Sequence, residues 1–221
     1  TTLFRSRQIV ADLSARTCTT LVVDETMVDL WYNAPPPPPL AAFNHDAPIV
    51  TVGSTGKSFW GGLRLGWIRA SSRTIAALVQ TRDTLDLGSP LLEQLATSWL
   101  LENEYHLLPE RRRLLTARRD MCAALMREYF PQWKFVLPEG GLSFWVELPE
   151  MMATRFAARA EASAIHLGVG TRFGLAGSGE RNLRIPFTLD DEILRRAFST
   201  LQPIWATLAG QHGANKMRKI I

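Results

Sequence analysis

Apolar and polar positions along the first part of the chain follow a pattern of short strands and helices. Mostly apolar runs predict buried strands at 20–24, 48–52 and 63–68. Three- and four-residue spacing of apolar positions predicts a short helix at 5–15 and an amphipathic helix at 72–85. Buried strands that alternate with helices are typical of an α/β layer, so we expect that architecture here.

The second part of the chain has a different pattern of apolar positions. Helical spacing continues from residue 90 to residue 130, and Pro109 is predicted to split this run into two helices. Beyond Pro131 the pattern predicts short strands and two further helices, at 134–137, 142–147, 154–163, 182–185 and 193–208. We therefore expect two domains, at 1–105 and 106–209, followed by a basic and flexible tail at 210–221.

Composition places the chain among ordinary globular proteins. Hydrophobic residues make up 46% of it and charged residues 21%. No apolar run approaches the roughly 20 residues of a membrane span, and the first residues lack the basic and apolar segments of a secretory signal. Cys18 and Cys122 are too few for a disulfide scaffold, so we expect a reducing, cytoplasmic location without membrane partners.

The net charge of +4 suggests a nucleic-acid partner at first sight. Without the three basic residues of the tail, Lys216, Arg218 and Lys219, the charge falls to +1. A cluster of arginines alternates with Leu and Ala on a predicted helix; its members are Arg111, Arg112, Arg113, Arg118 and Arg119. Such a cluster is typical of a solvated helix face, and nucleic-acid binding is the less favoured alternative.

Five consecutive prolines, Pro35 to Pro39, follow the first predicted strand. Proline donates no backbone hydrogen bond, so this segment is predicted to run extended over the surface. A stiff connection is favoured over a ligand for SH3-type domains.

Lysine usage singles out one residue. The chain has 4 lysines against 21 arginines, and Lys57 is the only lysine among the first 133 residues. It lies in a Gly/Ser-rich turn, Gly53-Ser-Thr-Gly-Lys-Ser58, directly after a predicted buried strand. An arginine stays protonated at ordinary pH, whereas a lysine amine can deprotonate and attack a carbonyl.

Two chemistries fit such a lysine. A phosphate-binding P-loop is suggested by Gly56-Lys57-Ser58 and the acidic strand Leu21–Glu25, but Thr51 stands where that motif needs glycine, and the acidic strand precedes the lysine. A Schiff base with pyridoxal phosphate needs an amine, an acid for the pyridine nitrogen, and hydroxyl and cationic groups for the phosphate. Four residues could supply them: Lys57, Asp24, Ser54 and Arg64.

Several segments resemble the class I/II aminotransferases, which are pyridoxal-phosphate enzymes of fold type I. The segments are Asp24-Glu25, Ser54-Thr-Gly-Lys57, Gly62-Leu-Arg-Leu-Gly66, Pro138–Glu147 and Arg181–Phe187. Within that family the chain is similar to the aminotransferase-like module of MocR-type regulators of the GntR superfamily. The resemblance covers about residues 1–208 and implies the C-terminal part of a three-layer αβα large domain, followed by a smaller α+β domain.

The resemblance also implies roles for individual residues. Lys57 would form the Schiff base, Asp24 would hold the pyridine nitrogen, and Ser54 with Arg64 would bind the phosphate. Arg184 would bind the α-carboxylate of an amino acid, with Arg181 a weaker candidate. Many relatives carry a tyrosine where this chain has Met27, and a methionine cannot donate the hydrogen bond of a phenol.

The resemblance implies one of two functions, amino-acid transamination or amino-acid sensing by a MocR-type regulator. It also implies a homodimer. The DNA-binding domain of such a regulator is not in this chain. The family's Asn-Pro-Thr-Gly turn would fall just before Thr1. We therefore expect the chain to be the rear part of a larger module, with weak or no catalysis by itself.

Overall fold

The computed structural model describes residues 2–175 and 178–218. The chain divides into two compact units, which we call unit 1 (residues 1–112 and 139–141) and unit 2 (residues 113–138 and 142–221). The chain first leaves unit 1 after Arg112, whereas the sequence pattern predicted a domain boundary after residue 105. The short segment 139–141 folds with unit 1 although unit 2 residues flank it on both sides.

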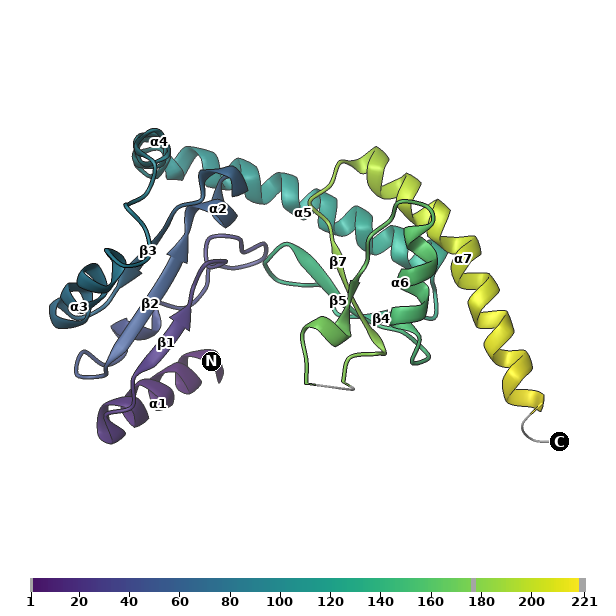
Figure 1. Cartoon of the computed structure of the whole chain (residues 1–221), viewed down its shortest axis with the longest axis horizontal. Helices are drawn as coiled ribbons and strands as arrows, with labels where there is room; N and C mark the ends of the chain where they lie inside the picture. Colours follow the sequence, from purple (N-terminus) through teal and green to yellow (C-terminus); the bar gives the residue numbers. More distant parts are fainter. Residues whose placement is uncertain (1, 176–177, 219–221) are drawn as a thin grey trace. The chain divides into compact units, whose positions relative to one another are not determined.

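A three-stranded sheet forms the centre of unit 1. Its strands are β1 (Leu21–Asp24), β2 (Ile49–Ser54) and β3 (Gly66–Arg69), in the order β1-β2-β3. β1 and β2 run parallel, with Asp24 opposite Val52, and β3 runs antiparallel to β2. The carboxyl ends of β1 and β2 therefore lie at the same edge of the sheet, which Figure 1 shows as two arrows pointing the same way.

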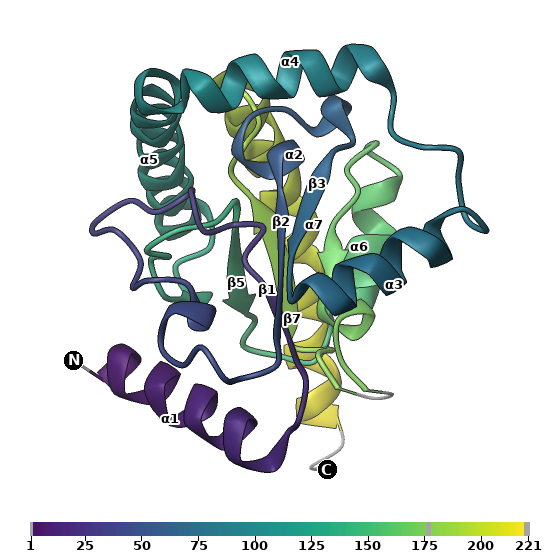
Figure 2. The same ribbon diagram turned by 90° about the vertical axis from the view of Figure 1, so that its left-hand side faces the viewer.

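Helices cover this sheet from both sides. On one face, Ala11 of α1 (Thr2–Thr17) packs with Leu40 and Ala41 of the 3₁₀ turn η1 (Leu40–Ala42) and with Ile49 of β2. α3 (Ser72–Arg82) lies on the other side of the sheet (Figure 2). The predicted α/β layer is thus confirmed.

The third strand differs from the prediction. It begins at Gly66 and not at residue 63, because Gly61–Leu63 form a 3₁₀ turn, η2, and Arg64 adopts a left-handed backbone with φ 53°. All four residues of β3 are exposed, and so are Val22 and Asp24 of β1, so the expectation of buried strands was wrong for these two strands and holds for β2. The only sheet neighbour of β3 among the described residues is β2.

The long helical run breaks at Asn103 and not at Pro109, so that prediction was wrong. α4 spans Leu91–Glu102 and α5 spans Glu104–Tyr129. The Asn103 side chain and backbone N both donate to the Trp99 carbonyl, at 2.8 and 3.2 Å, while its own carbonyl accepts from the His106 N–H at 3.1 Å. Pro109 lies inside α5, at its sixth residue, where its missing N–H leaves one helical hydrogen bond unmade without ending the helix.

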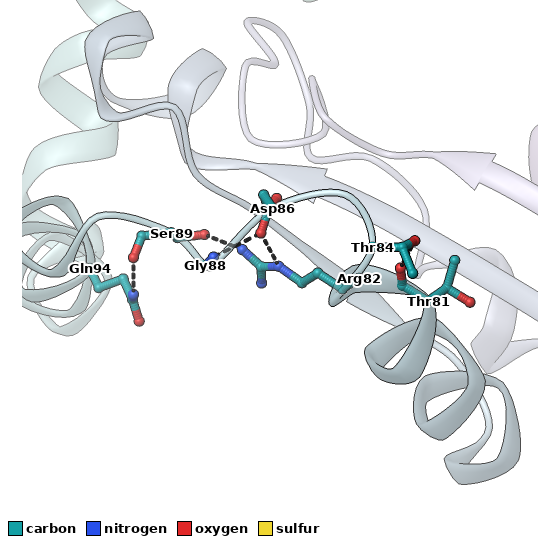
Figure 3. Close-up of polar contacts among 7 residues, drawn as sticks. All are labelled: Thr81, Arg82, Thr84, Asp86, Gly88, Ser89 and Gln94. Carbon is teal, nitrogen blue, oxygen red and sulfur yellow. Dashed lines mark hydrogen bonds and ion pairs between the residues drawn. The ribbon is translucent and has the colours of Figure 1, made fainter.

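The connection between α3 and α4 is held by polar contacts that Figure 3 draws. The Arg82 guanidinium binds the Asp86 carboxylate at 2.8 Å and donates to the Ser89 hydroxyl at 3.0 Å. The Asp86 carboxylate also accepts from the N–H of Gly88, whose φ of 133° favours glycine. Gln94 donates to the Ser89 carbonyl at 2.8 Å, which fixes the start of α4.

The proline run is anchored at its end by a buried acid. Pro38 accepts a hydrogen bond from Arg7 at 3.0 Å, and the N–H of Leu40 donates to the Glu25 carboxylate at 3.3 Å. Arg7 also contacts Glu25 at 3.4 Å, although Glu25 is only 7% exposed. Most of the prolines are exposed, in agreement with the predicted extended surface segment.

Unit 2 is a separate α+β unit. Its sheet is antiparallel with the order β4-β5-β7-β6; the strands are β4 (Lys134–Phe135), β5 (Ser143–Glu147), β6 (Gly168–Val169) and β7 (Asn182–Pro186). Two further helices belong to this unit, α6 (Ala153–Glu161) and α7 (Asp191–Arg218). α7 continues through most of the segment expected to be a tail, of which residues 219–221 lie outside the described residues.

Alternation along two strands builds the core of unit 2. Phe144 and Val146 of β5 and Leu183 of β7 point inward, while Trp145 and Arg184 stay on the exposed face. Aromatic rings extend this core between the helices and the sheet, through Phe130, Trp133, Phe156, Phe198 and Trp205.

The arginine cluster on α5 is not the solvated face that the sequence predicted. Arg118 donates to the Thr188 carbonyl at 2.8 Å, and Arg119, 4% exposed, donates to the Pro138 carbonyl at 2.9 Å. A guanidinium carries five donors, so a helix rich in arginine can bind backbone carbonyls as well as water. No helix in the described part of the chain has both the length and the apolar character of a membrane span.

Candidate functional site

The carboxyl edge of the unit 1 sheet brings together an acid, a hydroxyl and an amine. Asp24 ends β1 and Ser54 ends β2, its parallel neighbour. The short helix α2 (Thr55–Ser58) starts directly after Ser54 and carries Lys57 in its only turn. The Lys57 side chain is exposed and available for chemistry. The turn therefore places an amine next to the edge at which Asp24 ends.

Asp24 is held as a carboxylate. Hydrogen bonds from Thr26 are the main cause that lowers the pKa of this carboxyl, and the backbone N–H of Thr26 lies 2.9 Å from its Oδ1. The positive charge of Lys57 is a further, smaller cause that lowers the same pKa. Asp24 can thus present a negative charge at neutral pH.

Arg64 lies in the return from α2 to β3. It is exposed and has φ 53°, a left-handed conformation that few residues other than glycine adopt. Ser54 and Gly66 are paired across β2 and β3, and a Cβ at Gly66 would lie 2.7 Å from the Gly53 carbonyl oxygen. Thr55, the first residue of the Lys57 turn, donates through its N–H and its hydroxyl to the carbonyl of Leu65, the residue after Arg64, at 3.2 and 3.0 Å. These bonds hold the Arg64 segment beside the Lys57 turn.

Met27 borders a depression in the surface of unit 1. The depression has a volume of about 330 Å³, and Asp24, Trp31, Pro36 and Gly140 contribute to its lining. None of the residues that line it carries a side-chain hydroxyl, and Met27 contributes a thioether, which cannot donate a hydrogen bond. A larger depression of about 460 Å³ lies at the opposite ends of β1 and β2 and contains none of the predicted site residues.

Arg184 belongs to unit 2 and to the exposed face of its sheet. It is paired with Trp145 across β5 and β7, and its guanidinium carbon lies 4.6 Å from the centre of the Phe173 ring. Arg181, the weaker candidate, lies 3.8 Å from the carboxylate of Glu147. Because Glu147 already offsets the charge of Arg181, Arg184 is the better placed of the two to bind an added carboxylate.

Four of the five predicted site residues, Asp24, Ser54, Lys57 and Arg64, thus lie around one edge of the unit 1 sheet, and Arg184 lies in unit 2. Sequence reasoning missed Asp29 and Ser58, whose side chains are joined at 2.6 Å. Ser58 follows Lys57 directly, but no spacing in the sequence indicates that it is buried against a residue 29 positions earlier.

An acid and a lysine turn at the carboxyl edge of an α/β sheet, followed by an α+β unit, define the class of fold-type-I pyridoxal-phosphate proteins. The chain belongs to the aminotransferase class I and II family, whose family model matches residues 6–201. The resemblance seen in the sequence is thereby confirmed.

Curated relatives include both enzymes and regulators. The chain is 30% identical to the 2-aminoadipate transaminase of Thermus thermophilus over 78% of its own length and 45% of that protein. It is 32% identical to the uncharacterized HTH-type transcriptional regulator YisV of Bacillus subtilis, over 63% of its length and 30% of that protein. An aromatic-amino-acid aminotransferase of Thermococcus litoralis is 25% identical, over 89% of the chain and 48% of that protein. The chain thus spans less than half the length of these relatives.

Solved structures support the fold. LysN, the α-aminoadipate aminotransferase of Thermus thermophilus, complexed with N-(5'-phosphopyridoxyl)-L-leucine, matches with a TM-score of 0.86 at 24% identity, over 94% of this chain and 55% of its own. A multiple substrate aminotransferase of Thermococcus profundus matches with a TM-score of 0.79 at 25% identity, over 90% of this chain and 51% of its own. Neither comparison supports the P-loop alternative, and α2 has only four residues where a P-loop needs a helix.

Proposed function

We propose that this chain binds pyridoxal phosphate through Lys57 and contributes to amino-acid transamination. The observation that carries the proposal is the parallel register of β1 and β2, which places Asp24 at the same sheet edge at which β2 ends and the Lys57 turn begins. Ligand sites in α/β sheets lie outside the carboxyl ends of the strands. The family match and the aminotransferases among the relatives support the same function.

The donor set at this edge fits the cofactor. Asp24 keeps a carboxylate because its pKa is lowered, and only an ionised acid can hold a pyridine nitrogen in its protonated form. Ser54 supplies a half-buried hydroxyl and Arg64 an exposed guanidinium, which are suitable groups for a phosphate. Lys57 supplies the amine that an aldehyde requires.

When bound, pyridoxal phosphate supplies an electron sink for the bond that breaks at the substrate's α-carbon. The chain's own residues then have separate tasks. Asp24 would accept a hydrogen bond from the pyridine nitrogen and orient the ring, while Ser54 and Arg64 would bind the phosphate oxygens. Lys57 Nζ accepts a proton from the substrate carbon and returns one later, as a general base and acid.

For Arg184 we propose the binding of a substrate carboxylate. Its exposed guanidinium stacks on Phe173, which limits its rotation and leaves donors at the edge of its plane for a bidentate contact. The amino acid itself is not specified by these residues.

A second candidate function is ligand sensing in a transcriptional regulator. It is favoured by the HTH-type regulators among the relatives and by Met27, which cannot donate the hydrogen bond that a tyrosine would. In this case an amino acid is the effector, and DNA is bound by a domain outside this chain. For both functions we propose a cytoplasmic homodimer, and sedimentation of a cofactor-loaded protein as a monomer would contradict that state.

The first experiment is covalent trapping. The protein is mixed with pyridoxal phosphate and reduced with borohydride, and the modified lysines are identified by mass spectrometry. We expect modification of Lys57 at least about tenfold faster than that of Lys134, because a preorganised site raises the local reactivity of its amine. Lys134 is the matched internal control, an exposed lysine on β4.

Equal modification of the two lysines would contradict the proposed cofactor site, and so would an unchanged absorbance spectrum of the cofactor in Lys57→Ala. Enzyme and sensor are then separated by adding amino acids to the loaded protein. Release of a keto acid supports transamination, whereas a spectral change without keto-acid release supports sensing.

A further inference from the structure

Two adjacent arginines on α5 contact the Lys57 turn and the loop that follows Asp24. Arg111 donates to the backbone carbonyl of Lys57 at 3.2 Å. Arg112 donates through Nε to the backbone carbonyl of Asp29 at 2.7 Å, and its guanidinium carbon lies 4.2 Å from the centre of the Trp31 ring. These residues all belong to unit 1.

A side-chain hydrogen bond closes this arrangement into a ring. The Ser58 hydroxyl donates to the Asp29 carboxylate at 2.6 Å, and Ser58 is only 2% exposed. Lys57 and Ser58 are covalent neighbours, as are Arg111 and Arg112, so the ring consists of two peptide links and three hydrogen bonds. We call the four residues that close it the Lys57 clamp: Asp29, Ser58, Arg111 and Arg112.

We infer that the Lys57 clamp positions the Lys57 turn relative to the segment that follows Asp24. The inference rests on the proposed function, since it concerns the geometry in which Lys57 acts. None of the clamp residues is assigned to cofactor or substrate, so they are positioning residues. They act through the backbone of Lys57 and the loop that begins at Asp24.

The short helix α2 needs contacts from outside to hold Lys57 in one position. α2 has only four residues, too few for a helix that is stable by itself, and Lys57 is exposed within it. The first residue of the turn, Thr55, is held by its N–H and its hydroxyl, which both donate to the Leu65 carbonyl, at 3.2 and 3.0 Å. The contacts of Arg111 and Asp29 are made at the other end of the turn, at Lys57 and Ser58. Without outside contacts the turn would sample several conformations, and an error of about 1 Å in a reacting group can cost 100-fold in rate.

The clamp also accounts for two arginines of the cluster on α5. A role in nucleic-acid binding needs guanidinium groups directed at phosphates in solution. Arg111 and Arg112 instead bind backbone carbonyls within the same unit, and Arg112 is half-buried against Trp31.

The test compares clamp variants in the trapping experiment. We expect Ser58→Ala and Arg112→Ala to lower the rate of Lys57 modification relative to Lys134 by about tenfold, because the amine is no longer preorganised. Ser58→Thr keeps the hydroxyl donor and should restore most of the rate. Arg113→Ala is the matched control, because Arg113 is the next arginine on α5 and is exposed.

A second readout needs no cofactor. The carboxyl titration of Asp24 is followed by NMR in the presence and absence of the Lys57 side chain. With the clamp intact, Lys57→Ala should raise the pKa of Asp24, because it removes a nearby positive charge. In the Ser58→Ala or Arg112→Ala background that rise should be reduced.

The outcomes separate the two proposals. If wild-type Lys57 reacts no faster than Lys134, the cofactor proposal fails, while the Asp24 titration still tests the clamp. If Lys57 is selectively modified but Ser58→Ala and Arg112→Ala leave both readouts at the wild-type value, the clamp has no positioning role and the inference is overturned. Loss of selectivity in Arg113→Ala to the same degree would overturn it as well.

Discussion

At the scale of single residues, neighbouring donors and burial control the chemistry of this chain. Asp24 is exposed, yet Thr26 donates to it and Lys57 adds a positive charge, so its carboxyl is acidic. Cys122 shows the opposite effect, since burial without a charged partner raises the pKa of its thiol to about 12. Each effect leads to a measurable prediction.

The first prediction concerns acid stability. A lowered pKa means that folded Asp24 binds a proton less readily than unfolded Asp24, whose pKa is about 3.9. Its contribution to folding is therefore complete above the unfolded pKa and is lost as the pH falls through the lowered, folded pKa. We expect Asp24→Asn to remove this part of the acid dependence, measured by urea unfolding between about pH 6 and pH 3. An identical pH dependence in the variant would contradict the assigned contacts.

The second prediction concerns the two thiols. Both cysteines are free, but Cys18 is exposed whereas Cys122 is fully buried. A thiol reagent at mild pH should label Cys18 rapidly and Cys122 only after unfolding, because the thiolate is the reactive form. Mass spectrometry of the native and urea-unfolded protein measures the difference. Rapid labelling of native Cys18→Ser would show that Cys122 is accessible.

At the scale of elements, stability depends on side chains that hold irregular segments to regular ones. The proline run cannot pair with a strand, and its path depends on Glu25, the residue directly after β1. Glu25 accepts from the Leu40 N–H and contacts Arg7. Removing a buried acceptor of this kind lowers the free energy of unfolding by more than the net contribution of its hydrogen bonds, because a buried donor is left without a partner.

We therefore predict that Glu25→Ala lowers the free energy of unfolding by about 1–3 kcal/mol. Glu25→Gln should lower it less, because an amide oxygen can still accept from the Leu40 N–H. Urea denaturation measures both, and the rate of proteolysis within residues 33–40 reports on the loop. Equal stability of Glu25→Ala and wild type would refute the anchoring role.

Element positions also show what the sequence could predict. The parallel strands β1 and β2 and the acid and lysine that follow them could be predicted, since apolar runs ending in polar groups are local patterns. The start of β3 could not, because the left-handed conformation of Arg64 has no residue signature. The strand β6 has two residues, too few for a period to appear. The Lys57 clamp joins residues 29, 58, 111 and 112, and such a contact is set by tertiary packing alone.

At the scale of the whole molecule, the two units have different sources of stability. Unit 2 has an aromatic core with several fully buried phenylalanines, such as Phe144 and Phe156. Unit 1 has a smaller cluster around α1 and β2, and exposed apolar residues on α4, such as Leu92 and Trp99. It also takes in residues 139–141, where Gly140 bridges to Trp31 and the Tyr32 hydroxyl donates to the Gly141 carbonyl.

This segment gives the fourth prediction. A Cβ at Gly140 would lie 2.6 Å from the Leu30 carbonyl oxygen, so Gly140→Ala should destabilise unit 1 by about 1–3 kcal/mol. Hydrogen exchange should show faster exchange at the Tyr32 and Gly141 amides, which donate to the Glu139 and Leu30 carbonyls, and unchanged exchange in β5 and β7. Gly210→Ala, at a helical position with open space around it, is the control and should not destabilise. Faster exchange in β7 alone would contradict the assignment of this segment to unit 1.

The same segment determines when unit 1 can finish folding during synthesis. A ribosome adds roughly 5–20 residues per second, so residues 139–141 follow Arg112 after a delay of a second to several seconds. Throughout that delay Trp31 and Tyr32 lack the backbone partners they have in the folded chain, while the first residues of unit 2 are already being made. A nascent chain arrested shortly before residue 139 should therefore hold an incomplete unit 1 that is open to chaperones, and one arrested well beyond residue 141 should not.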